Sequence, residues 1–209
     1  GYSGLYKTTD GGFNWLNVMT NVYANSINFP NTLTAYLGGE QGLIRKSTNS
    51  GANWNQLNTV LTTNDIYSFY FFNANTGFMS EEYGAFYKTT NGGTNWNIIS
   101  NTVSGANCIL FLDQNTGYTG HGAGYGSGMV RKTTNGGLNW TAYAAPRAVY
   151  SLFFTDANTG FGTGNDASIV KTTNAGQDWF FVYGGSGWTN SVFFVGQTTG
   201  YAVGLSSPD

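Results

Sequence analysis

Short apolar runs recur along the chain, and each is followed by a turn that contains glycine. Residues 68–72 form one run ahead of Asn-Thr-Gly-Phe at 75–78, and residues 151–154 form another ahead of Asn-Thr-Gly-Phe at 158–161. No stretch carries apolar residues at the 3.6-residue spacing of an amphipathic helix, and Gly interrupts every segment. The pattern therefore predicts short β-strands. Related turns lie at 31–36 (a degenerate copy), 115–118 and 198–201.

A second motif occurs five times between these turns. It reads Thr or Ser, any residue, Asp or Asn, any residue, Gly, any residue, Asn or Asp, Trp, and a Lys precedes each copy. The tryptophans recur about every 40 residues, a period typical of propellers and solenoids. The four defining positions of each copy are Thr8, Asp10, Gly12 and Trp15; Ser47, Asn49, Gly51 and Trp54; Thr89, Asn91, Gly93 and Trp96; Thr133, Asn135, Gly137 and Trp140; and Thr172, Asn174, Gly176 and Trp179.

Each repeat reads as four short antiparallel strands, which we call A to D. The apolar run is strand A, and the Asn-Thr-Gly turn leads into strand B. A variable loop leads to strand C, which contains the Lys, and the Trp motif is the turn into strand D. Four strands in a repeat of about 40 residues predict an all-β fold, a β-propeller with one blade per repeat.

The two ends of the chain carry complementary parts of a repeat. Residues 5–7 read as strand C, whereas residues 191–194 and 201–203 read as strands A and B. Pairing them would complete a fifth blade, close a five-bladed ring and cover the terminal edges. The alternative is an arc of a larger propeller. The predicted single domain spans 1–209, with blade units at 1–20 plus 190–209, 21–60, 61–102, 103–145 and 146–189.

The Trp motif has the chemistry of a tight turn. The hydroxyl and the Asp or Asn side chain can hydrogen-bond backbone N–H groups, and the Gly suits a positive φ. The Trp is expected to bury its ring as an anchor. Four copies carry Asn where the first has Asp10, and an amide is a weak choice for acid–base or metal chemistry. We therefore interpret these residues as structural.

The motif resembles the Asp-box, or bacterial neuraminidase repeat. Its Lys-Thr-Thr-Asn-Gly-Gly form, as at residues 88–93, is similar to repeats of secreted bacterial propellers and of photosystem II assembly-factor propellers. The resemblance covers all five repeats. It implies a propeller in which the box is a fold element away from the active site, shared by sialidases, other glycosidases, sorting receptors and pure binding proteins. It therefore implies the fold and leaves the function open.

Composition narrows the range of partners. Charged residues are 9% of the chain, the net charge is −2, and the five lysines all belong to the repeats. Without a basic patch, nucleic acid is not expected as a partner, and no apolar run is long enough to span a bilayer. The single Cys108 is expected to be a buried thiol. The chain has no initiator Met or signal peptide, so we expect a processed piece, and its Asn-, Thr- and Gly-rich composition favours a secreted or surface bacterial protein.

Strand order assigns the loops to two ends of the blades. A–B turns and boxes share one end, and B–C and D–A loops share the other. Six acids outside the boxes and the A–B turns, including Asp65 and Asp209, fall at the second end together with Arg147. We predict that this end binds the ligand, with Trp188, the only Trp outside a box, as a candidate stacking platform. The candidate binding residues are Trp188, Tyr23, Tyr67, Tyr150, Glu40, Glu81, Glu82, His121 and Asp166.

A sialidase mechanism is disfavoured because it needs an arginine cluster. Of three arginines, Arg45 and Arg131 occupy equivalent strand-C positions and look like repeat variation. No cofactor or metal is expected, because the lone His121 has no partner for a metal pair; calcium at the acidic end has no supporting motif. We predict a non-catalytic propeller that binds a glycan or a protein. The alternatives are a glycosidase-type enzyme with paired carboxylates and a self-assembling, homo-oligomeric subunit.

Overall fold

The computed structural model describes residues 4–57, 62–82, 86–100, 105–122 and 126–205. The chain forms two compact units, residues 1–104 and 105–209, and each is described by itself. That all 209 residues form one domain stays a prediction. Within the described ranges, no helix is long and apolar enough to cross a bilayer.

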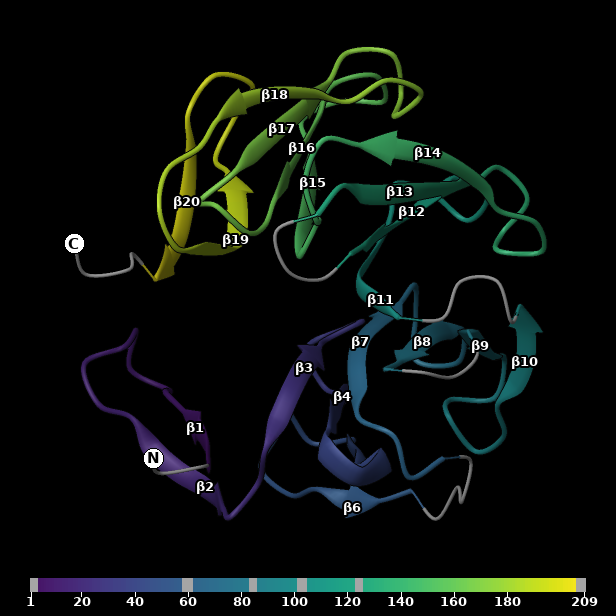
Figure 1. Ribbon diagram of the computed structural model, residues 1–209. Coiled ribbons are helices and arrows are strands. Elements are labelled where there is room, and N and C mark those ends of the chain that lie inside the picture. The colour runs from purple at the N-terminus through teal and green to yellow at the C-terminus, as the bar shows by residue number, and fades with distance from the viewer. Residues whose placement is uncertain (1–3, 58–61, 83–85, 101–104, 123–125, 206–209) are drawn as a thin grey trace. The chain divides into compact units, whose positions relative to one another are not determined.

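The first unit contains two four-stranded antiparallel sheets, each built from strands A to D in chain order (Figure 1). Each strand D begins directly after a box Trp, as the sequence predicts. A short 3₁₀ turn, η1 (Glu40–Gly42), joins strands B and C of the first sheet. The strands of the two sheets are β3 (Ala24–Asn28), β4 (Ala35–Gly39), β5 (Ile44–Ser47) and β6 (Asn55–Gln56), and β7 (Ile66–Phe71), β8 (Gly77–Glu81), β9 (Phe86–Thr89) and β10 (Asn97–Ser100).

The second unit repeats this architecture. Its two four-stranded sheets again follow the order A to D, which confirms the predicted blades and their strand register (Figure 1). The strands are β11 (Ala106–Phe111), β12 (Gly117–His121), β13 (Gly128–Thr133) and β14 (Thr141–Ala145), and β15 (Ser151–Phe154), β16 (Gly160–Thr163), β17 (Ile169–Thr172) and β18 (Phe180–Tyr183).

The strands nearest the ends of the chain form two-stranded sheets. β1 (Gly4–Lys7) pairs with β2 (Leu16–Thr20), and β19 (Trp188–Phe194) pairs with β20 (Gly200–Leu205). These are the predicted C–D and A–B pairs, although β19 begins two residues before the predicted boundary of the last unit. Closure of a ring by a fifth blade stays a prediction.

Stacked aromatic rings hold neighbouring sheets together within each unit. The Tyr36 and Phe71 rings lie 3.6 Å apart and nearly parallel, and the Tyr118 and Phe154 rings lie 4.3 Å apart. In both cases a strand-B Tyr of one sheet meets a strand-A Phe of the next. The Gly of the Asn-Thr-Gly turn makes room for that Phe, since a Cβ on Gly77 would lie 2.4 Å from the Phe71 ring. This contact explains why the turn carries Gly.

The box forms the predicted turn in every copy. In the copy that begins at Thr133, the hydroxyl accepts the N–H of Gly137 at 3.0 Å and donates to Asn135 at 3.0 Å. The Asn135 side chain then accepts the N–H of Asn139 at 2.9 Å. The box Gly has a positive φ in all five copies, for example 87° at Gly137. The boxes are therefore confirmed as turn elements whose polar groups are used within the turn.

One expectation about the box is wrong, because Trp15 does not bury its ring. Trp96 and Trp179 are buried, whereas Trp15 is 61% exposed. A buried box Trp packs against a strand-A Phe of its own sheet, as Trp179 does against Phe154 at a ring distance of 6.1 Å. Within the first unit the β1–β2 sheet has no strand A, so no Phe of that unit covers Trp15 in this way.

The Lys before the box connects one sheet to the next in three copies, at Lys7, Lys46 and Lys132, a role that the sequence did not reveal. The Lys46 Nζ lies 5.2 Å from the centre of the Tyr36 ring, directly across from it on the neighbouring strand. The same Nζ donates to the carbonyl of Gly92 in the next box at 3.0 Å, and the Tyr36 hydroxyl donates to the carbonyl of Ala74 at 2.7 Å. Burial lowers the pKa of Lys46.

The second unit contains the same connection. The Lys132 Nζ lies 5.6 Å from the Tyr118 ring centre and donates to the carbonyl of Ala175 at 2.9 Å. The Tyr118 hydroxyl donates to that carbonyl at 3.0 Å. Because Ala175 belongs to the next box, the Lys and the Tyr together join two blades. We call this arrangement the lysine bridge.

The A–B turns predict a dependence of stability on pH. Asp113 and Asp156 each accept two backbone N–H groups, which lower the pKa of both carboxyls. A carboxyl with a lowered folded pKa contributes stability above its unfolded pKa of about 4, and that stability is lost as the pH falls through the folded pKa. Asn31 and Asn73 make the same two bonds in the first unit.

We therefore expect Asp113→Asn/Asp156→Asn to flatten the loss of stability below pH 4. At pH 7 the free energy of unfolding of the double variant should be close to that of the parent, because both side chains are exposed. Urea unfolding at pH 7, 4, 3 and 2.5 measures both quantities. An unchanged pH slope in the double variant would show that these turns do not carry the effect.

Candidate functional site

Hydrogen bonds distinguish the two ends of each blade. The A–B turn accepts a bond from the box of the same blade, as in Gly92 N–H to the Asn75 carbonyl at 2.8 Å and Ala175 N–H to the Asn158 carbonyl at 2.9 Å. The B–C and D–A loops lie at the opposite end of the strands. We call this second end the loop end and describe it in each unit separately.

The loop end of the first unit brings four predicted residues together. The Glu40 N–H donates to the Tyr23 carbonyl at 3.0 Å. The neighbouring Gln41 N–H donates to the Asp65 carboxylate at 3.0 Å, and the Glu82 N–H donates to the Asp65 carbonyl at 3.0 Å. Asp65 therefore ties the B–C loops of both blades in this unit to the D–A loop between them.

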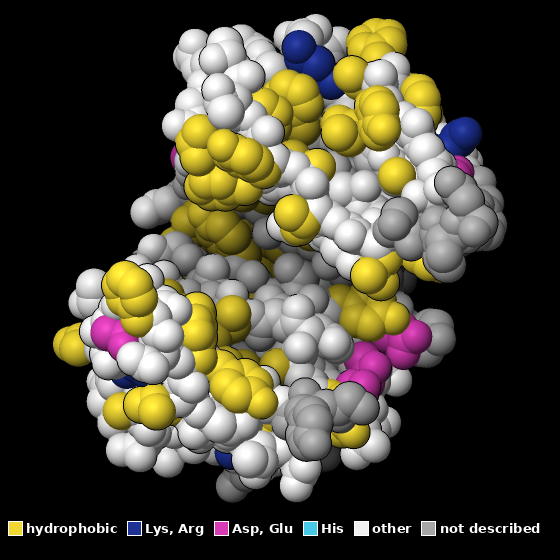
Figure 2. All heavy atoms as spheres, turned by 90° about the vertical axis from the view of Figure 1, so that its left-hand side faces the viewer, with side chains coloured by type: hydrophobic (Ala, Val, Ile, Leu, Met, Phe, Trp, Pro, Cys, Tyr) yellow, Lys and Arg dark blue, Asp and Glu magenta, His cyan; other side chains and the backbone are white. Residues whose placement is uncertain are grey.

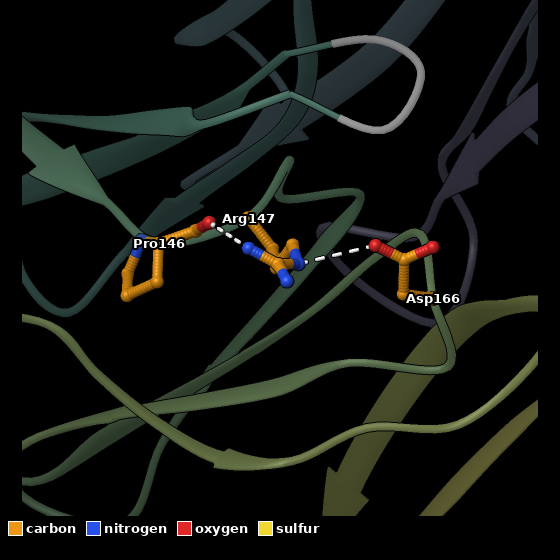
Figure 3. A network of polar contacts seen from close by, with 3 residues as sticks. All are labelled: Pro146, Arg147 and Asp166. Atoms are coloured by element: carbon orange, nitrogen blue, oxygen red, sulfur yellow. Dashed lines mark hydrogen bonds and ion pairs between the residues drawn. The ribbon is translucent and has the colours of Figure 1, made fainter.

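The loop end of the second unit centres on an ion pair. Arg147, between β14 and β15, places its Nε 3.1 Å from the carboxylate of Asp166, between β16 and β17 (Figure 3). The Arg147 Nη1 donates to the carbonyl of Pro146 at 2.9 Å, and the guanidinium lies 5.5 Å from the ring centre of Phe181. These contacts fix the orientation of the guanidinium.

Trp188 lies beside this ion pair. It is 41% exposed and forms a β-bridge with Asn165, next to Asp166. The Ala167 N–H donates to the Gly187 carbonyl at 3.0 Å. Trp188 is the first residue of β19, which begins three residues before the predicted start of this strand A at Ser191, and its indole is solvent-accessible at the loop end.

Glu81 and His121 lie at the ends of buried strands rather than in loops. Glu81 ends β8 and is 3% exposed, and His121 ends β12 and is 8% exposed. The Tyr87 hydroxyl donates to Glu81 at 3.4 Å, and the Thr119 hydroxyl lies 2.7 Å from His121 Nε2. Their predicted solvent-exposed loop positions are wrong, because strand B is buried along its whole length in these blades. A ligand-binding role for either stays a prediction.

The remaining candidates are partly buried or outside the described residues. Tyr67, within β7, and Tyr150, which donates its N–H to the Thr163 carbonyl at 2.7 Å, are both half-buried. Asp209 lies outside the described residues. Cys108 is partly buried in β11, and burial raises the pKa of its thiol to about 12.

Sequence reasoning missed several residues at the loop end. Phe181 supports Arg147, and Asn21 and Gln41 line a cavity beside Tyr23. Asn21 and Gln41 have φ of 54° and 55°, a conformation that no sequence pattern marked. Within the described ranges, no group of three or more His, Cys, Asp or Glu residues could hold a metal ion.

Comparisons with known proteins identify relatives of the fold. Residues 2–127 match the family model described as Photosynthesis system II assembly factor YCF48. No curated protein matches the chain. A structure described as YCF48 bound to D1 peptide has a TM-score of 0.65 at 16% identity. The match includes 83% of this chain but only 57% of that one.

Two further structures have the same fold. YCF48 from Cyanidioschyzon merolae has a TM-score of 0.67 at 15% identity, with 96% of this chain matching 74% of that one. A GH74 enzyme from Niastella koreensis has a TM-score of 0.74 at 18% identity, with 92% of this chain matching 38% of that one. At these identities the likeness shows a β-propeller fold, and an enzyme and an assembly factor share it.

Proposed function

Because this chain belongs to the family of the photosystem II assembly factor YCF48, we propose that it is a non-catalytic propeller protein that binds a protein partner at its loop end. The observation that carries the proposal is the difference between the two ends of the blades. The polar side chains of the boxes are used in turn hydrogen bonds, whereas the loop end carries polar groups that do not repeat from blade to blade, Glu40 and the Arg147–Asp166 pair, beside the exposed rings of Tyr23 and Trp188. Exposed rings also occur in the first box, at Phe13 and Trp15, so the combination of rings with unrepeated charges is what distinguishes the loop end. Trp, Tyr and Arg are enriched among the residues that contribute most to binding at protein interfaces.

The family and a structural relative support a protein as the ligand. A relative of this fold has been solved with a D1 peptide bound. Two of the loop-end acids are engaged within the protein, which disfavours them as a facing pair of catalytic carboxylates: Asp166 pairs with Arg147, and Glu81 is buried against Tyr87. Glycosidase-type catalysis is the alternative, and hydrolysis of a polysaccharide panel by the intact chain would establish it.

A labelled D1 peptide tests the proposal by fluorescence anisotropy. We expect Trp188→Ala and Tyr23→Ala to weaken binding about tenfold each, which corresponds to about 1.4 kcal/mol. The control is Leu138→Ala, since Leu138 is an exposed apolar residue (64%) within a box. No binding by the parent protein, or an equal loss in Leu138→Ala, would contradict the proposal.

A glycan is the finer alternative for the same end. Trp188 supports it, because an exposed indole beside acids and amides can stack on a sugar ring. Binding of an oligosaccharide panel without D1-peptide binding would favour the glycan. Composition also suggests a secreted or surface location in a bacterium, which fractionation of the native host would test. It suggests self-association as well, which a measurement of the mass in solution would test.

A further inference from the structure

A cavity of about 300 Å³ opens at the loop end of the first unit. It is formed between a D–A loop, which ends before β3, and the B–C loop between β4 and β5. The D–A loop joins β2 to β3, and the B–C loop joins two strands of the β3–β6 sheet, so both loops are attached to that sheet. Its lining residues are Asn21, Val22, Tyr23, Glu40, Gln41 and Leu43.

Backbone contacts hold the cavity walls in place. The Glu40 N–H donates to the Tyr23 carbonyl, and the Leu43 N–H donates to the Glu40 carbonyl at 3.1 Å. The Asp65 carboxylate fixes Gln41 from the adjacent blade. Gly39 approaches so closely that a Cβ would lie 1.9 Å from the Tyr23 carbonyl oxygen. A preformed cavity of this kind loses little conformational freedom when it binds a ligand.

The lining offers a negative charge, an aromatic ring and amide oxygens. The Glu40 side chain is exposed, and within the described part of the chain no hydrogen bond or ion pair to its carboxylate is found. The Tyr23 side chain is 57% exposed. Asn21 and Gln41 contribute carboxamides, and no Lys or Arg lines the cavity.

The cations of this unit are placed elsewhere. Lys7 donates to the Ser50 carbonyl at 2.8 Å, Lys46 forms a lysine bridge, and Lys88 lies over a strand-B ring, all near the boxes. Arg45 lies within β5, and no ion pair of its guanidinium with Glu40 is found among the described residues. Figure 2 shows acidic side chains grouped at the lower right, where no Lys or Arg side chain adjoins them in that view. Among the described residues of the first unit, no cation neutralises the charge of Glu40.

We propose that this cavity binds a Lys or Arg side chain presented by a protein partner. Glu40 pairs with the cation, the Tyr23 ring lies against it, and the amide oxygens of Asn21 and Gln41 accept its other N–H groups. An aromatic face attracts a cation, and the planar guanidinium matches a carboxylate especially well. This inference rests on the proposed function, since it specifies what the partner places at one part of the loop end.

The test is an NMR titration of the intact chain with N-acetyl-arginine amide. We expect shifts of the backbone amides at 21–23 and 40–43, with a dissociation constant of about 1–10 mM, typical of one weakly held group. N-acetyl-citrulline amide has nearly the same shape without the charge and should bind at least about fivefold more weakly. Equal shifts with the neutral compound, or shifts elsewhere only, would overturn the inference.

Two variants complete the test. Glu40→Gln should weaken N-acetyl-arginine amide at least about fivefold, because it removes the charge from an exposed position. Asp156→Asn removes one acid from an A–B turn and should leave binding unchanged. Equal binding by Glu40→Gln would overturn the inference. If the D1 peptide still binds in a Trp188-dependent manner, the proposed function stands despite that result; loss of both interactions removes both.

Discussion

Replacing Gly164 by Ala should destabilise the protein by about 3 kcal/mol, at the upper end of the usual cost of overpacking. The added Cβ would lie 1.8 Å from the backbone carbonyl oxygen of Ala148. That oxygen belongs to the main chain and cannot rotate away as a side chain would. Either the loop before β17 or the loop before β15 must shift.

Such a shift would break further bonds, because Gly164 donates its N–H to the Ser168 carbonyl and accepts the Thr189 N–H at 2.8 Å. Urea unfolding measures the loss. Gly185→Ala is the control, since the nearest atom to its new Cβ is the Ala167 Cβ at an ordinary 3.7 Å. Equal stability of Gly164→Ala and Gly185→Ala would show that this close approach is not a constraint.

Replacing Lys132 by Met should cost about 2 kcal/mol, because the lysine bridge combines a charge-assisted hydrogen bond with a cation–π contact. Met keeps most of the apolar stem that packs beside Tyr118. It removes the Nζ that donates to the Ala175 carbonyl. Burial lowers the pKa of Lys132, which means that the charged form is partly desolvated in the folded protein. Removing the charge avoids this desolvation cost and so offsets part of the loss.

Lys171→Met is the matched control in the same unit. Lys171 lies 5.4 Å from the centre of the Phe161 ring, but within the described residues no carbonyl accepts its Nζ. We expect it to lose about 0.5–1 kcal/mol, the cation–π part alone. Chemical denaturation of the two variants separates these contributions. Equal losses would contradict the assignment of the larger share to the hydrogen bond between blades.

Spacing and turn chemistry made the fold predictable. The Trp motif and the Asn-Thr-Gly turn mark both turns at one end of each blade, and this is why the order of strands A to D is correct. Their local bonds need only neighbouring residues, so the sequence carries the whole signal. The lysine bridge was missed because it joins residues more than 40 positions apart, as with Lys132 and Ala175.

The loop end was harder to predict, because its residues do not repeat. The sequence placed Tyr23, Glu40, Arg147 and Asp166 at this end, and the structure brings them into two local groups. It misplaced Glu81 and His121, because β8 and β12 extend far enough to include them. The last residue of these strands is buried, whereas a loop residue at the same position would be exposed to solvent. The cavity beside Tyr23 depends on loop conformation and leaves no pattern in the sequence.

The central claim is that partners bind at the loop end, and hydrogen–deuterium exchange with and without the D1 peptide tests it most directly. We predict slower exchange in the B–C and D–A loops, at residues 21–24, 39–43, 146–150 and 164–168, and unchanged exchange in the boxes. Protection confined to the boxes and A–B turns, or no protection at saturating peptide, would contradict the claim.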